Sequence, residues 1–78
     1  MPEIRSPLPG SFYRRPAPDQ PPFKEVGDRV EPGDVIGLVE VMKSFNEIRA
    51  DVAGTILSFA VEDEEPVMAG AVLVELEG

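Results

Sequence analysis

Glycine and proline interrupt this chain so often that no stretch is free to form a helix of ordinary length. Seven of the nine prolines precede Phe23, and proline has no backbone N–H to donate within a helix. After Val26, short runs rich in β-branched residues alternate with turn signals, and apolar residues do not recur at helical spacing. The sequence therefore predicts an all-β fold, with turns at residues 27–28, 32–34, 51–54, 62–66 and 69–70.

The composition restricts the chemistry that the chain can perform. Its 78 residues predict one small domain over residues 1–78, which buries roughly 60% of the surface that the unfolded chain exposes. Cysteine and histidine are absent, so the sequence offers no disulfide, no thiolate or imidazole metal ligand and no histidine base. We therefore expect neither a metal site nor catalysis by the chain itself.

The net charge of −8 argues against nucleic acid or an anionic membrane surface as a partner. No apolar run approaches the roughly 18 residues that a membrane span requires. The first residues also lack the long apolar segment of a signal peptide. These features predict a cytoplasmic location.

An internal repeat divides the chain into two similar halves. Residues 4–12 align with residues 48–56 at an offset of 44, and residues 30–36 align with residues 67–73 at an offset of 37. The first half thus holds extra residues between its matching pieces, where the chain carries a proline-rich segment, residues 14–22, here called the proline loop. The repeat predicts a flattened barrel or sandwich of two four-stranded antiparallel sheets related by a pseudo-twofold axis.

Lys43 lies at the junction of the two halves, between two strand-like runs. The connection Met42-Lys43 is a poor choice for a two-residue hairpin turn, because both central positions of a type I′ turn need positive φ and favour asparagine or glycine. A disagreement between local chemistry and architecture often marks a functional site. Lys43 is therefore the leading candidate for a functional residue.

Glu40-Val41-Met42-Lys43 resembles the biotin-attachment motif of biotin carboxyl carrier domains, usually Glu-Ala-Met-Lys-Met. Residues 6–27, including the proline loop, resemble the carrier of bacterial acetyl-CoA carboxylase, so the likeness covers nearly the whole chain. The resemblance implies a biotinyl-domain fold with biotin attached covalently to Lys43 on an exposed turn. Val41 replaces the usual alanine and Ser44 the second methionine, and we expect modification to survive both changes.

The resemblance also implies roles for the neighbouring residues. In carriers of the acetyl-CoA carboxylase type a protruding thumb can lie against the biotin, and here it corresponds to about residues 15–22. Arg15 stands where some members carry a hydroxyl residue that hydrogen-bonds the biotin ureido group. We expect ligase recognition by Glu40, Val41 and Met42, and biotin contact by Arg15, Pro16, Ala17 and Pro18.

The implied partners are a biotin protein ligase, a biotin carboxylase that carboxylates the biotin ring, and a carboxyltransferase that passes the carboxyl group to an acyl acceptor. The chain would contribute reach and a high effective concentration, as the swinging arm of fatty acid synthesis in acetyl-CoA carboxylase. Carriers of propionyl-CoA, methylcrotonyl-CoA, urea and pyruvate carboxylases are related, so the acceptor stays open.

Two other interpretations remain. A lipoyl carrier shares the fold and the hairpin lysine, although its lysine typically follows aspartate or alanine. An unmodified β module could bind a protein partner through the proline loop, and would keep its activity without Lys43. The acidic run at residues 62–65 suggests a metal site, but consecutive side chains cannot all face one point, and we expect a solvated loop.

Overall fold

The computed structural model describes residues 2–77, and over this range the chain forms strands joined by turns and loops. The predicted all-β fold is therefore confirmed. The strands are β1 (Glu3–Arg5), β2 (Gly10–Tyr13), β3 (Arg29–Val30), β4 (Val35–Val41), β5 (Ser44–Arg49), β6 (Gly54–Phe59), β7 (Glu65–Val67) and β8 (Val72–Glu77).

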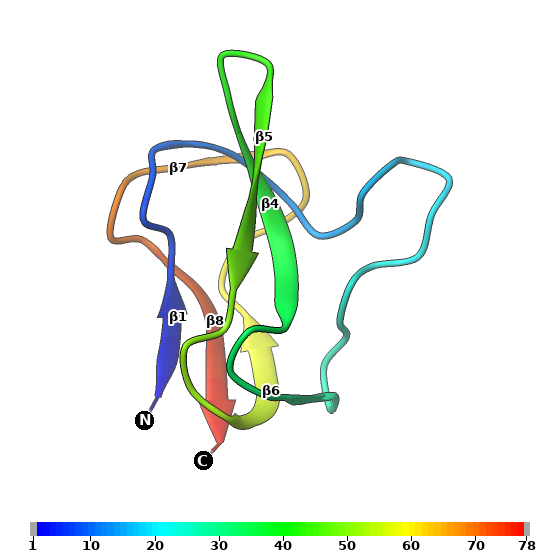
Figure 1. Ribbon diagram of the computed structural model, residues 1–78, viewed down its shortest axis with the longest axis vertical. Coiled ribbons are helices and arrows are strands. Elements are labelled where there is room, and N and C mark those ends of the chain that lie inside the picture. The colour runs from blue at the N-terminus through cyan, green and yellow to red at the C-terminus, as the bar shows by residue number, and fades with distance from the viewer. Residues whose placement is uncertain (1, 78) are drawn as a thin grey trace.

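The strands form two four-stranded sheets, ordered β1-β8-β6-β3 and β5-β4-β2-β7. Every pair of neighbouring strands is antiparallel. Figure 1 shows the β4–β5 hairpin extending from one end of the molecule, while the ends of the described chain lie at the other. The predicted sandwich of two four-stranded antiparallel sheets is confirmed.

The core consists of side chains that the two sheets bury between them. Phe12 from β2 and Ile56 from β6 occupy equivalent central positions, and both are almost fully buried. Removing one such side chain from water contributes about 1.5–3 kcal/mol. The largest fully buried hydrophobic side chains are Phe12, Val30, Ile36, Val39, Ile56, Leu73, Val74 and Leu76.

The pseudo-twofold relation predicted from the repeat is present in the strand order and in the hydrogen bonds. Exchanging β1 with β5, β8 with β4, β6 with β2 and β3 with β7 converts one sheet into the other. The guanidinium of Arg5 donates to the carbonyl of Gly70 at 2.9 Å, and that of Arg49 donates to the carbonyl of Gly33 at the same distance. The two bonds are related by the offsets of the sequence repeat.

Two boundaries differ from the sequence prediction. The turn predicted at residues 62–66 ends earlier, because Pro66 belongs to β7 and pairs with Ser11. Proline is tolerated there because β7 is an edge strand, so its missing N–H breaks no ladder within the sheet. Likewise, Gly54 already belongs to β6 rather than to the preceding turn.

The proline loop leaves the sandwich after β2 and contains no strand. In Figure 1 the segment between β2 and β3 projects sideways from the two sheets. Within residues 2–77, no helix is long and apolar enough to cross a membrane.

Candidate functional site

The β4–β5 hairpin presents Lys43 on its two-residue turn. Val41 and Ser44 are paired across the hairpin, which leaves Met42 and Lys43 as the connection. Their φ angles are 50° and 67°, so both residues adopt the left-handed conformation that a type I′ turn requires. The mismatch inferred from the sequence is therefore real, and the left-handed conformation costs an L-residue about 1–2 kcal/mol.

The turn is open to solvent. The Met42 side chain is 94% exposed, and Lys43 is exposed as well. Figure 1 shows this tip at the end of the molecule opposite to both ends of the described chain. A partner can therefore approach Lys43 without contacting the chain ends.

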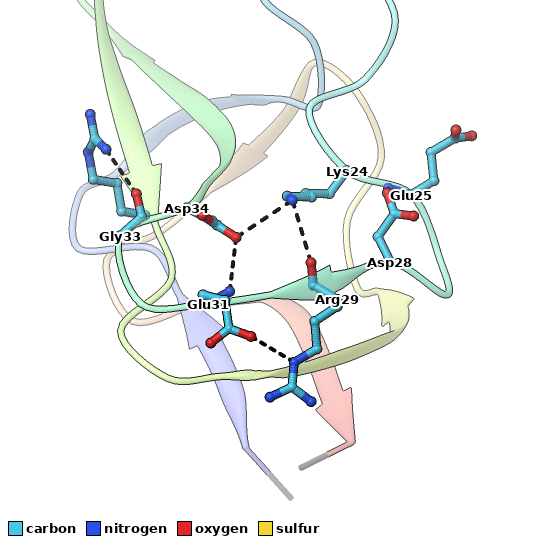
Figure 2. A network of polar contacts seen from close by, with 8 residues as sticks. Lys24, Glu25, Asp28, Arg29, Glu31, Gly33 and Asp34 are labelled. Carbon is cyan, nitrogen blue, oxygen red and sulfur yellow. Dashed lines mark hydrogen bonds and ion pairs between the residues drawn. The ribbon is translucent and has the colours of Figure 1, made fainter.

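The other lysine of the chain is held by its neighbours. Lys24 Nζ lies 3.6 Å from Asp34 Oδ2 and 3.5 Å from the carbonyl oxygen of Arg29. Figure 2 shows the Lys24 side chain directed into this network, where Asp34 also accepts a hydrogen bond from the N–H of Glu31 at 2.9 Å. No contact of this kind joins Lys43 to another residue in the described range 2–77. The structure thus distinguishes an engaged lysine from an available one.

Close to its turn, the hairpin is tied to β2 by an aromatic and polar cluster. The Tyr13 hydroxyl donates to Glu40 Oε1 at 3.1 Å, and the Tyr13 and Phe45 rings lie 5.8 Å apart at a tilt of 59°. The hydrogen bond to Glu40, partial burial and the charges of Glu40 and Glu64 raise the pKa of Tyr13 above its ordinary 10.0. Glu40 therefore supports the hairpin from within, a contact that the sequence did not indicate.

A cavity of about 260 Å³ lies beside this cluster, between the proline loop, the sheet that contains β2 and β5, and the corner before β7. The residues expected to contact biotin all line it. Prolines and aromatic rings give it an apolar lining, and charged side chains line it as well, a combination typical of pockets for small molecules. Its lining residues are Tyr13, Arg15, Pro16, Ala17, Pro18, Phe45, Asp63 and Glu64.

Sequence reasoning missed four members of this region, Tyr13, Phe45, Asp63 and Glu64. The acidic run was expected to be a solvated loop, and for Asp63 that expectation is wrong, because its Oδ1 accepts a hydrogen bond from the N–H of Arg14 at 2.6 Å. The acidic run gave no sign that Asp63 is engaged, nor that Glu65 belongs to β7 and accepts a hydrogen bond from the N–H of Glu62. Among residues 2–77, no group of acidic side chains is arranged to hold a metal ion.

The fold and the hairpin define a class of small β-sandwich domains that present one lysine on a tight, exposed turn. The family model described as "Biotin-requiring enzyme" matches residues 2–76, and the chain belongs to this biotinyl and lipoyl family.

Two curated relatives are carriers by name. The chain is 49% identical over 67 residues to the biotin carboxyl carrier protein of acetyl-CoA carboxylase 1, chloroplastic, of Arabidopsis thaliana, covering 86% of this chain and 24% of that protein. It is 48% identical over 64 residues to the biotin carboxyl carrier protein of acetyl-CoA carboxylase of Pseudomonas aeruginosa, covering 82% of this chain and 41% of that protein. The chain thus spans less than half the length of either relative.

A solved structure with the same fold comes from a large enzyme. The crystal structure of the urea carboxylase of Kluyveromyces lactis superposes with a TM-score of 0.77 at 25% sequence identity. The match covers 97% of this chain and 6% of that protein.

Proposed function

We propose that this chain is a biotin carrier domain whose biotin is attached to Nζ of Lys43. The observation that carries the proposal is the motif Glu40-Val41-Met42-Lys43 on an exposed turn, with both Met42 and Lys43 at positive φ. A deprotonated Nζ attacks the activated carboxyl group of biotin, which forms an amide and expels the activating group. The ligase supplies the activated biotin, and the turn supplies an accessible amine.

Biotin protein ligase is the first proposed partner, and it reads the turn. Met42 offers an apolar handle beside the acceptor, since its side chain projects into solvent. Val41 and Glu40 precede it at the end of β4. Among residues 2–77, only one oxygen of the Glu40 carboxylate accepts a hydrogen bond, that from Tyr13, so one residue can both brace the hairpin and face the ligase.

A biotin carboxylase and a carboxyltransferase are the proposed partners of the biotinylated domain, which itself catalyses neither step. Acetyl-CoA is the proposed acyl acceptor, since the relatives from Arabidopsis and Pseudomonas are named as carriers of acetyl-CoA carboxylase. We propose residues 1–78 as one carrier domain. A cytoplasmic location stays part of the proposal, although the Arabidopsis relative is named as chloroplastic.

The proline loop is proposed to act as a thumb over residues 15–22 that receives the biotin ring. Pro16, Ala17 and Pro18 line the cavity together with Phe45, and they offer apolar contact to the bicyclic ring. Arg15 is engaged within the protein, as its guanidinium reaches the carbonyl of Gln20 at 3.4 Å and the carboxylate of Asp63. We therefore propose that Arg15 supports the thumb and that its apolar neighbours contact biotin.

Attachment is tested by co-expression with a biotin protein ligase and measurement of the intact mass. The unaltered chain is expected to gain one biotinyl group, and Lys43→Arg is expected to gain none. Lys24→Arg is the matched control, because it changes the other lysine and should leave the modification intact. An unmodified chain would contradict the proposal, and a lipoyl group on Lys43 would establish the lipoyl alternative.

The acyl acceptor is tested by recovering partners with the biotinylated domain as bait. Recovery of a carboxyltransferase that uses acetyl-CoA supports the proposal, whereas a urea or pyruvate carboxylase would replace it. If Lys43→Arg recovers the same partners in the same amount and keeps the biological activity of the chain, the chain acts instead as an unmodified interaction module.

A further inference from the structure

Asp63 holds the base of the proline loop with both of its carboxylate oxygens. Oδ1 accepts the hydrogen bond from the Arg14 N–H at 2.6 Å, and Oδ2 lies 3.3 Å from Arg15 Nε. The second contact is an ion pair without the alignment of a hydrogen bond. Both charged side chains are about one-third exposed, so solvent screens the pair only in part.

No other residue outside the loop offers an equivalent polar contact in the described chain. For residues 14–22, the hydrogen bonds and ion pairs that reach beyond the loop and its closing residue Phe23 all go to Asp63. The loop is closed on itself by the Phe23 N–H, which donates to the Arg14 carbonyl at 2.9 Å. The Arg14 guanidinium also lies 4.0 Å from the centre of the Phe59 ring. The Asp63 carboxylate thus binds the backbone of Arg14, the residue at which the loop begins and to which Phe23 closes it.

The residue after Asp63 has a strained backbone. Glu64 has φ of 66°, and its N–H donates to the carbonyl of Phe12 at 2.6 Å. The residue related to it by the pseudo-twofold axis is Gly27, which has φ of 95° and donates to Ile56 at 2.9 Å. Both halves therefore need a left-handed corner, but only one half fills it with glycine.

The strained corner faces the cavity, since Asp63 and Glu64 both line it. A non-glycine residue in the left-handed region costs free energy and persists where the surroundings require it. The two contacts that Asp63 makes with Arg14 and Arg15, here called the clamp, therefore belong to the same wall of the cavity as the strained corner at Glu64.

We propose that Asp63 is a positioning residue, which fastens the proline loop to the β6–β7 corner and so shapes the cavity. The clamp exists in the unmodified chain. Its purpose, to present a preformed pocket to the biotin ring, rests on the function proposed above. A preformed pocket loses less conformational entropy when its ligand docks.

The test is amide hydrogen exchange on the full chain, measured by nuclear magnetic resonance before biotinylation. Asp63→Ala is expected to speed exchange of the Phe23 amide by about tenfold or more, because a charge-assisted acceptor at the loop base is lost. The amide of Gly27, bonded to Ile56, should keep its protection. Glu62→Ala is the matched control, as it removes a neighbouring acid from the same corner and should leave Phe23 unchanged.

Asp63→Asn separates charge from hydrogen bonding and guards against a variant that fails to fold. The asparagine side chain can still accept a hydrogen bond from the Arg14 N–H, so we expect Asp63→Asn to keep most of the Phe23 amide protection that Asp63→Ala loses. Because the ion pair with Arg15 is then gone, added salt should no longer weaken this contact. Unchanged Phe23 exchange in both Asp63 variants would overturn the clamp. So would equal acceleration of the Phe23 and Gly27 amides, which would indicate general destabilisation.

The biotinylated chain distinguishes this inference from the proposed function. Nuclear Overhauser contacts between the biotin ring and Pro16 or Phe45 are expected, and they should weaken in Asp63→Ala. Contacts that persist at full strength in that variant would overturn the positioning role while leaving the thumb intact. If the Phe23 effect holds but no biotin contact is seen, the clamp stands and the proposed thumb function fails.

Discussion

Replacing Met42 by glycine should stabilise the protein, although it removes a residue of the proposed attachment motif. Met42 has φ of 50° and a side chain that is 94% exposed, so the replacement loses almost no packing. Relief of the left-handed strain contributes about 1–2 kcal/mol. The greater conformational freedom of glycine in the unfolded chain lowers this gain in stability by about 0.5–1 kcal/mol. With mid-range values the net gain is about 0.75 kcal/mol, which corresponds to a rise in Tm of roughly 3–6 °C for a domain of this size.

The assay is reversible thermal and urea unfolding followed by circular dichroism, with Met68→Gly as the matched control. Met68 is 73% exposed but is not among the described residues with positive φ. Its replacement adds glycine's conformational freedom without relieving strain, so the protein should lose about 0.5–1 kcal/mol. If Met42→Gly lowers Tm as Met68→Gly does, the turn is not strained and the reasoning is refuted.

The same variant should lose biotin acceptance while gaining stability. Glycine removes the apolar handle beside Lys43, so we expect slower modification by the ligase at an unchanged lysine. Intact mass at timed intervals measures this rate, and a rate equal to that of the unaltered chain would show that Met42 is not read by the ligase. A gain in stability with a loss of modification would show that the strain is retained for function.

Three further changes test the hairpin and its surroundings. Gly10→Ala should cost about 3 kcal/mol in urea unfolding, because the added Cβ would clash with the backbone carbonyl oxygen of Glu40, and an unchanged midpoint would contradict this close approach. Tyr13, the one tyrosine of the chain, should ionise above pH 10.0 in an ultraviolet titration, and Glu40→Gln should move its pKa back toward 10.0. Tyr13 ionises at a lower pKa in the unfolded chain than in the folded one. The hydrogen bond from Tyr13 to Glu40 therefore stabilises the fold fully below pH 10.0, and this stabilisation is lost as the pH rises through the folded pKa. If Tyr13 titrates identically in Glu40→Gln and in the parent chain, Glu40 is not the cause of the raised pKa. Glu64→Gly should raise the free energy of unfolding by about 0.5–1 kcal/mol, and a decrease would mean that the corner is unstrained.

The sequence by itself determined the fold class and singled out the residue proposed as the site. Glycine and proline identify turns through their own φ preferences, and β-branched runs identify the strands between them, so these signals are local. The internal repeat predicted the pseudo-twofold arrangement of the two sheets, because segments with matching sequence patterns bury matching faces. Lys43 could be singled out because Met42-Lys43 violates a local rule for the turn that contains it.

Tertiary structure alone decided which groups support that turn and which lysine stays available. The Tyr13 hydroxyl meets Glu40 across 27 residues, and the Arg14 N–H meets Asp63 across 49. Such pairs depend on how the sheets pack and where loops close, and no residue type records its distant partner. Lys43 and Lys24 are both lysines on a polar chain, yet only the packed structure engages Lys24 with Asp34 and leaves Lys43 exposed. Local sequence patterns thus specified where the strands and turns lie, while contacts between distant residues specified the surroundings of the turn at Met42 and Lys43.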